Sequence, residues 1–412
     1  LHTDNRRQRQ MCIRDSTKPE PYYGLNVDCK CFPQRYPYGT GGLTAQRDKY
    51  LPDASFEQTR VMSSNNYQRR DLPYLLHLTG QKEKRQIKAG IFSVQNKSFK
   101  SMSKGDIKND VQQENPELLK RISSVLKNLP TQREFWNNVR SKVEAMVFEF
   151  GPTTFWATFS PGEYDDQEML KYLRERNSDL PNVETMTVSQ LVCKDPILAC
   201  TYLQTKFDAT LKFLLSDANP IGKIKHHFVR TEYQTRLMPH FHCFFWVEDA
   251  PIIGQDSEET ILDFIGKYVS CKLPSPNEDP VMHGLVKKYQ YHHCNSYCLR
   301  KPKKGGKARC KFGFPRDACT KPMLHGVATS IASHKTGSYK KRLYELQRKH
   351  NEKCINDYNP TLLYLWQGNV DLQFIGEESE SLLEYICKNA TKAPKSAITD
   401  FEINAMKNEK KS

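Results

Sequence analysis

The stretch Pro239–Val247 reads PHFHCFFWV, and bulky apolar residues occupy both of its alternating sets of positions. Side chains two residues apart in a β-strand point to the same face, so His240 and His242 project together, with Phe244 and Trp246 beyond them. A strand that is apolar on both faces is a central, buried strand. We therefore predict a central strand whose first residues present two imidazoles, a pair that can bind one divalent ion.

A second strand, predicted at Lys225–Gln234, precedes this one and pairs with it through a short turn. It carries Glu232 and Gln234 two residues apart, and either side chain can supply an oxygen ligand. Gln234 is nearer the turn and is the first choice, with Glu232 the second. Two imidazoles and an oxygen suit Mn²⁺ or Mg²⁺, although imidazole also suits Zn²⁺. Taken alone, a His-x-His pair is a weak signal that more often has a structural role than a metal-binding one.

The composition points to a folded protein with a polyanionic partner. The chain has 412 residues, of which 38% are hydrophobic, which is enough for about two to three domains. Lysine and arginine number 62 against 47 acidic residues, and this excess favours nucleic acid before a membrane. The sequence contains no run of 18 apolar residues, so no membrane span is predicted. The 13 cysteines come without an export signal, so metal ligands and reduced thiols are expected rather than disulfides.

Composition and periodicity divide the chain into regions. Residues 1–16 resemble the translation of a sequencing-library adapter and are excluded from the fold prediction. We predict an N-terminal accessory region at 17–147 and an α+β domain at 148–394. A small Cys/His-rich module is inserted at 283–320, and a basic tail or linker follows at 395–412.

Hydrophobic periodicity predicts the main elements. Helices are predicted at 72–78, 81–93, 116–129, 131–147, 195–215, 258–269 and 379–392. Further strands are predicted at 153–159 and 362–375.

The inserted module has the spacing of metal ligands. Cys294, Cys298 and Cys310, with either His292 or His293, can complete a tetrahedral zinc site. Reduced thiols without a metal are the alternative. A basic loop lies between the second and third cysteines, and we predict that it contacts DNA through Arg300, Lys301, Lys303, Lys304 and Lys307.

Several segments, in order along the chain, resemble a known family. Glu232–His242, EYQTRLMPHFH, resembles the HUH signature of the Helitron replication-initiator domain, from rolling-circle transposons. The Helitron helicase-like N-terminal region is also similar to the chain at 31–42, 155–161, 195–211 and 358–371. The resemblance implies an antiparallel-sheet HUH endonuclease palm flanked by helices, a divalent metal (Mg²⁺ or Mn²⁺) and a tyrosine that attacks single-stranded DNA. It also implies a 5′-phosphotyrosine intermediate that permits rejoining.

The family's nucleophile motif, Tyr-x-x-Lys-Tyr-x-x-Lys, resembles YICKNATK beginning at Tyr385. Tyr385, Lys388 and Lys392 share one face of the predicted helix. The resemblance makes Tyr385 the nucleophile, and ammonium groups beside it would favour the phenolate and contact phosphate oxygens. Asn389 stands where the family has its second tyrosine, so a cycle with two alternating nucleophiles is not expected.

Three functional hypotheses follow. The first is a Helitron-like transposase fragment that nicks and rejoins single-stranded DNA. The second is a catalytically decayed, DNA-binding remnant of such an element, which Asn389 favours. The third is an unrelated metal-dependent hydrolase that uses His240 and His242. No Walker-type phosphate loop occurs, so the helicase that normally follows in the family is expected to be missing from this chain, and the resemblance implies action in the nucleus of a eukaryotic host.

Overall fold

A computed structural model describes the chain at residues 26–63, 66–98, 124, 126–162, 166–233, 238–301, 307–325 and 343–376. The chain divides into two compact units, Leu1–Leu129 and Pro130–Ser412. The sequence had set the boundary near residue 147. The difference arises because helix α7 (Arg133–Phe150) belongs with the second unit, where its buried Val143 packs on the sheet.

The first unit holds α2 (Val27–Cys31), α3 (Asp53–Val61) and α4 (Leu72–Ser98). The two helices predicted at 72–78 and 81–93 are one continuous helix, which corrects the sequence prediction. Gly80 lies between the two predicted segments, and a glycine inside a helix costs only about 1 kcal/mol relative to alanine. Burial of Tyr74, whose hydroxyl lies 2.7 Å from that of Tyr36, offsets that cost.

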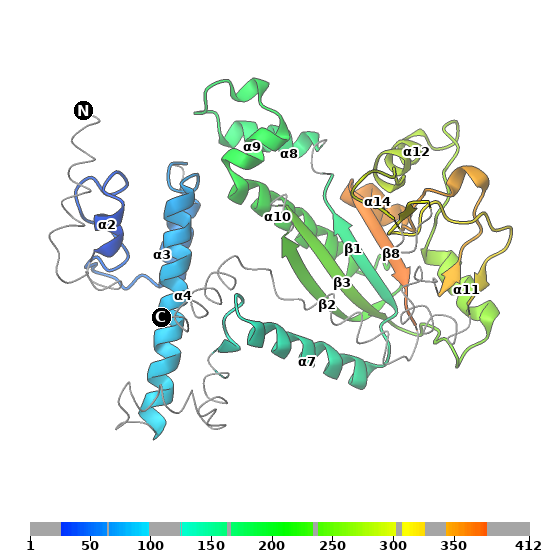
Figure 1. Ribbon diagram of the computed structural model, residues 1–412, viewed down its shortest axis with the longest axis horizontal. Coiled ribbons are helices and arrows are strands. Elements are labelled where there is room, and N and C mark those ends of the chain that lie inside the picture. Colours follow the sequence, from blue (N-terminus) through cyan, green and yellow to red (C-terminus); the bar gives the residue numbers. More distant parts are fainter. Residues whose placement is uncertain are drawn as a thin grey trace. The chain divides into compact units, whose positions relative to one another are not determined.

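The second unit is built on a four-stranded antiparallel sheet in the order β2-β3-β1-β8, visible in Figure 1. The strands are β1 (Phe155–Ser160), β2 (Ile224–Tyr233), β3 (Pro239–Val247) and β8 (Asn369–Phe374). Every residue of β3 is buried except His242, which is partly exposed. The predicted central strand is therefore confirmed, and the unit is α+β as expected.

Helices cover both faces of this sheet. Phe241, Cys243 and Phe245 of β3 share one core with α10 (Pro196–Leu214), α11 (Glu258–Tyr268) and α14 (Pro360–Trp366). Phe244 and Trp246 point the other way and pack against α7. Because successive side chains of β3 point to opposite faces, the strand contributes to two separate cores.

Local capping explains where the helices begin. Asp195 accepts a hydrogen bond from the backbone amide of Leu198, and Pro196 takes the first position of α10, as predicted. The strand predicted at 362–375 is wrong in its first half. Asn359 caps α14 through the amide of Leu362, so this segment is helical and the strand begins only at Asn369.

The remaining elements are short. They are α8 (Gln167–Arg176), η1 (Val183–Thr185), α9 (Val188–Lys194), α12 (Pro280–Leu285), η2 (Val286–Gln290), β4 (Leu299–Arg300), β5 (Arg309–Cys310), β6 (Met323–Leu324), β7 (Tyr344–Glu345) and η3 (His350–Glu352). Among the described residues, no helix combines the length and apolarity needed to cross a membrane.

A buried ion network joins the Cys/His segment to the sheet. The Asp357 carboxylate accepts from Arg348 at 2.9 Å and also from Arg316. The Asp357 and Arg348 side chains are 0% and 1% exposed. The backbone carbonyl of Asp357 accepts from the amide of Leu372 in β8, so one residue contacts both parts.

Replacing Asp357 with asparagine should destabilise the chain strongly. Two guanidinium groups would lose their buried counter-charge, and breaking a buried pair in this way costs about 3–5 kcal/mol. Denaturant unfolding measures the change in free energy. Glu175→Gln is the matched control, because it breaks an exposed pair with Lys171 and should change the unfolding free energy little. Equal stability of the two variants would contradict the structural role of Asp357.

Candidate functional site

Strand register gathers polar side chains in two rows on one face of the sheet. Residues that pair across antiparallel strands lie on the same face. One row crosses the sheet as Glu232, His240, Ser160 and Asn369. The next row is Arg230, His242, Thr158 and Asp371. We call these eight residues the histidine face.

Two hydroxyl groups of β1 orient the two imidazoles. His242 Nδ1 lies 3.1 Å from Thr158 Oγ1, and His240 Nδ1 lies 2.8 Å from Ser160 Oγ. Each hydroxyl can accept the Nδ1 hydrogen, and a metal bound at Nε2 of His242 would take the place of the hydrogen that this nitrogen otherwise donates to Glu232. The rings are therefore held as metal-binding histidines usually are.

Glu232 is the carboxylate that meets this pair. Its Oε2 lies 3.0 Å from Nε2 of His242, and its side chain is 40% exposed. The hydrogen bond with His242 lowers the pKa of Glu232, and the charges of His242 and Arg230 act in the same direction, whereas burial opposes them. A carboxylate is thus maintained next to the imidazoles. Gln234, the first choice from the sequence, lies outside the described residues.

Arg230 brings a buried positive charge to the same face. It pairs with His242 across the strands, and its guanidinium carbon stands 4.3 Å from the centroid of the Trp136 ring on α7. Burial lowers the pKa of Arg230, while the neighbouring Glu232 raises it. The stack on Trp136 holds the guanidinium at a fixed position, where it can interact with an anion bound near the histidines.

The end of β1 is fixed by the turn that leads into β8. Trp366 Nε1 donates to the Ser160 carbonyl at 2.8 Å. A Cβ atom on Gly368 would stand 2.5 Å from that same oxygen, so only glycine fits. This close approach secures the backbone that carries the Ser160 hydroxyl.

Sequence reasoning did not single out Thr158, Ser160, Arg230 or Asp371. For the two hydroxyls, the sequence does contain a signal. Alternate positions of this strand read Trp156, Thr158 and Ser160, so one face changes from an aromatic side chain to hydroxyl side chains. Their roles depend on pairing with β3, and the sequence does not reveal that register.

The histidine face contains residue types that bind divalent cations in other proteins. Two imidazoles and a carboxylate are a combination that Mn²⁺, Mg²⁺ and Zn²⁺ sites use. In the described part of the chain, the one group of three or more His, Cys or acidic donors within 4.8 Å of one another is instead the Cys/His cluster. The donor atoms of His240, His242 and Glu232 therefore do not all lie within 4.8 Å of one another in this structure.

The Cys/His cluster consists of His292, Cys294, Cys298 and Cys310. This selects His292 over His293, which the sequence had left open. In tetrahedral zinc sites, Zn–S bonds of about 2.3 Å place sulfurs about 3.8 Å apart, which is compatible with this spacing. Cys319 lies outside this cluster, and its thiol donates to the Lys321 carbonyl.

Backbone amides donate hydrogen bonds to two of the thiol sulfurs. The Asn295 amide donates to Cys298 Sγ at 3.2 Å, and the Phe312 amide donates to Cys310 Sγ at 3.4 Å. Burial opposes ionisation of Cys310, yet amide and thiol hydrogen bonds lower its pKa in net. Burial and hydrogen bonding to Cys310 raise the pKa of Cys294 to about 12. The cluster can therefore hold a metal ion.

Of the residues predicted to contact DNA or to act in catalysis, some lie beside the cluster and others lie outside the described residues. Arg300, Lys301 and Lys307 are exposed beside this cluster, whereas Lys303 and Lys304 lie outside the described residues. The predicted nucleophile Tyr385, with Lys388 and Lys392, also lies outside them.

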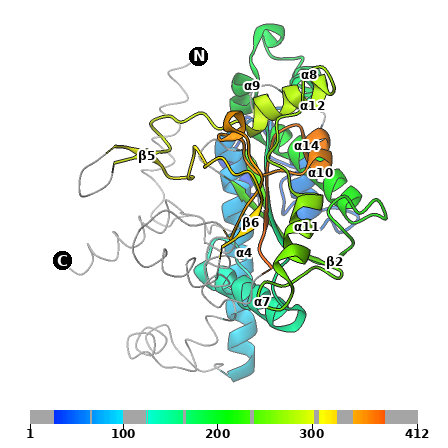
Figure 2. The ribbon, with the colours of Figure 1, turned by 90° about the vertical axis from the view of Figure 1, so that its right-hand side faces the viewer.

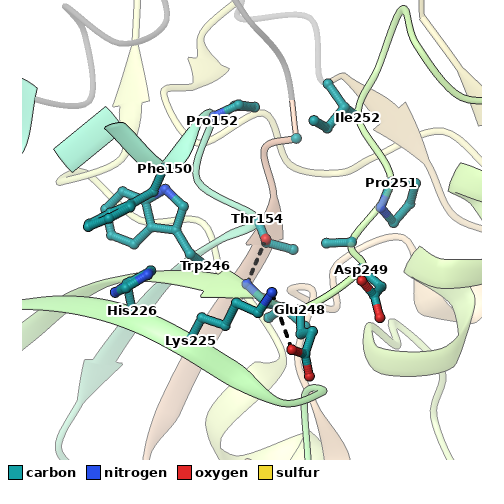
Figure 3. A pocket seen from close by; sticks show the side chains of 13 residues that line it. Phe150, Pro152, Thr154, Lys225, His226, Trp246, Glu248, Asp249, Pro251 and Ile252 are labelled. Atoms are coloured by element: carbon teal, nitrogen blue, oxygen red, sulfur yellow. Dashed lines mark hydrogen bonds and ion pairs between the residues drawn. The ribbon is translucent and has the colours of Figure 1, made fainter. Parts of the chain in front are cut away.

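A cavity of about 290 Å³ opens at the opposite end of β3. Figure 3 shows Phe150, His226 and Trp246 on one side of it and Pro251 and Ile252 on the other. Trp246 is six residues from His240, or about 20 Å along a strand. The cavity is therefore separate from the histidine face.

Residues 64–245 match the family model described as the Helitron helicase-like domain at the N-terminus. Over this range the chain is similar to that domain, which confirms the Helitron resemblance found in the sequence for the segments that lie inside the match. The match includes β1, β2 and β3 as far as Phe245, and thus both histidines. It ends before the Cys/His cluster and before Tyr385. None of the curated proteins is significantly similar to the chain.

Replacing Thr158 with valine should weaken binding of Mn²⁺ by roughly 10- to 100-fold, the usual effect of losing a group that orients a ligand. Valine keeps the shape of threonine but offers nothing to His242 Nδ1. Calorimetric titration of the full chain measures the affinity. Thr158→Ser retains the hydroxyl and should bind as the wild type does. Equal weakening in both variants would mean that packing, and not the hydrogen bond, matters.

Proposed function

We propose that the chain acts as a Helitron-like transposase with an HUH-type endonuclease palm that nicks and rejoins single-stranded DNA. The observation that carries this proposal is the oriented pair His240 and His242 beside the Glu232 carboxylate, on a central antiparallel strand within the Helitron match. The family relation further favours action on chromosomal DNA in the nucleus of a eukaryotic host.

The histidine face would hold Mg²⁺ or Mn²⁺ through His240, His242 and Glu232, with Gln234 as a further candidate. A bound divalent ion would supply polarisation of the scissile phosphate. Arg230 lies in the same row as His242, and its guanidinium would neutralise charge on the phosphate oxygens. Thr158 and Ser160 would keep the imidazoles oriented while DNA enters.

Tyr385 is the proposed nucleophile. Its phenolate oxygen would form a bond to phosphorus while the bond to the 3′-oxygen breaks, and that oxygen would take a proton to leave as a 3′-hydroxyl. Lys388 and Lys392 would favour the phenolate and contact the phosphate. The reverse reaction would rejoin a strand, because the phosphotyrosine bond conserves the energy of the phosphodiester.

Chain length is compatible with this role. β8 ends beside Phe155, at the end of β1 away from Ser160, and five residues of strand span about 17 Å. Eight residues lie between Gly376 and Tyr385, which makes nine Cα-to-Cα steps. Nine steps span about 13 Å as a helix, which is less than about 17 Å, and about 30 Å when extended, so Tyr385 would reach the histidines through a connection that is at least partly extended.

Tyr385→Phe should abolish the covalent protein–DNA adduct while leaving Mn²⁺ affinity unchanged, because phenylalanine lacks only the attacking oxygen. The assay incubates a labelled single-stranded hairpin with Mn²⁺ and separates the adduct on a denaturing gel. Tyr364→Phe, at an exposed tyrosine of α14, is the control and should retain the adduct. An adduct that persists in Tyr385→Phe would overturn the nucleophile assignment.

A second candidate is a catalytically decayed DNA-binding remnant, favoured by Asn389 in place of the family's second tyrosine. Such a protein would bind DNA with a steep dependence on salt but leave the hairpin intact. The wild-type lane of the same assay distinguishes the two functions.

The Cys/His cluster is proposed to hold a structural Zn²⁺. Three thiols and one imidazole are a common ligand set for closed zinc sites, in which all four positions come from the protein. Cys298 and Cys310 flank the paired strands β4 and β5, so the ion would tie the base of this hairpin together.

Purified protein should contain about one zinc per chain, and Cys310→Ser should lose it, because serine is a poor ligand for zinc. Elemental analysis by mass spectrometry gives the content. Cys193→Ser replaces an exposed cysteine on α9 and should keep the metal. Zinc retained in Cys310→Ser would exclude this ligand set.

A further inference from the structure

Two large aromatic rings stand exposed beside the Cys/His cluster. Tyr297 is 68% exposed and Phe312 is 51% exposed. Their ring centroids are 6.5 Å apart. Lys311 Nζ lies 3.6 Å from the centroid of Tyr297 and 4.7 Å from that of Phe312, so one ammonium group contacts both rings. Nothing in the predicted chemistry of the cluster requires these rings.

The cluster fixes the backbone that carries both rings. Tyr297 directly precedes Cys298, and its amide donates to Asn295 Oδ1 at 3.0 Å. The Phe312 amide donates to Cys310 Sγ, and the Lys311 amide donates to the Cys298 carbonyl at 2.8 Å. The two rings therefore lie on neighbouring turns that are joined through the thiol-bearing residues.

The segment that carries the rings contains only basic charges in its sequence, and of these the Arg316 side chain is mostly buried and paired with Asp357. Residues 291–316 contain no aspartate or glutamate. Their basic residues are Arg300, Lys301, Lys303, Lys304, Lys307, Arg309, Lys311 and Arg316. A positive segment with exposed rings suits a polyanion that also presents flat apolar faces, and this is the chemistry of single-stranded nucleic acid.

We propose that Tyr297 and Phe312 form a platform on which unpaired bases of single-stranded nucleic acid stack, with Lys311 contacting the adjoining phosphate. Stacking tolerates every base because each has a π-face, and paired bases inside a duplex are not available to the rings. This inference deepens the proposed function: it names a place, apart from the histidine face, where the strand is held.

The position of this platform agrees with that role. Figure 2 shows β5 on an arm that projects away from α10, α11 and α14. Those three helices cover the face of the sheet opposite the histidines. The arm thus extends on the side of the sheet that carries His240 and His242, and a strand held on it would remain on the side of the chemistry.

The test measures binding of an oligonucleotide that contains 2-aminopurine, a base whose fluorescence falls when it stacks. The full chain is titrated without Mg²⁺ or Mn²⁺, so that no cleavage occurs. Tyr297→Ala and Phe312→Ala should each weaken single-strand binding by roughly five- to a hundred-fold, the range that base–aromatic stacking spans. Tyr297→Phe keeps a ring and should restore binding. Tyr364→Ala removes an exposed tyrosine from α14 and should have no effect.

Three further readouts separate the outcomes. Affinity for a duplex of the same sequence should change little in the alanine variants; an equal loss for duplex would mean general charge binding and would overturn the platform. Unchanged single-strand affinity would overturn it as well, as would tighter binding of an acidic peptide than of DNA. Zinc content shows whether each variant keeps its cluster, and wild-type nicking is scored separately. Weakened binding without any nicking would support the platform and reject only the catalytic proposal.

Discussion

The burial of β3 on both faces is the constraint on which the second unit depends. Its odd-numbered core residues pack under α10, α11 and α14, and its even-numbered aromatics pack under α7. A slip of one residue would exchange these sets and turn the imidazoles of His240 and His242 into an apolar core. The free energy gained by burying both sets of β3 side chains therefore stabilises the register that brings both histidines to one face.

Four strands build the histidine face, with Asn369 and Asp371 contributed by β8, and no single strand contains its chemistry. β3 supplies the imidazoles, β1 supplies the hydroxyls of Thr158 and Ser160, and β2 supplies Glu232 and Arg230. α7 contributes Trp136, which holds the Arg230 guanidinium. The elements that stabilise the sheet are thus the same ones that orient the polar groups.

The Cys/His arm and the sheet are coupled through the segment that contains Asp357. Tyr291 pairs with Ile355 just before the cluster, and Arg316 meets Asp357 just after it. The carbonyl of Asp357 then accepts from Leu372 in β8. Because the Asp357 carboxylate at the centre of these contacts is fully buried, they attach the base of the arm to the sheet, while the Cys/His cluster organises its outer part.

Local physics allowed the sequence by itself to predict much of this protein. Period-two alternation identified β3, an Asp-Pro pair identified the start of α10, and cysteine spacing identified the cluster. Only tertiary structure selected His292 over His293, made residues 360–366 a helix and brought Thr158 and Ser160 to the imidazoles. The physical reason is separation: the hydroxyls stand 84 and 80 residues before the histidines they contact, and only the folded register of two strands brings such distant residues together.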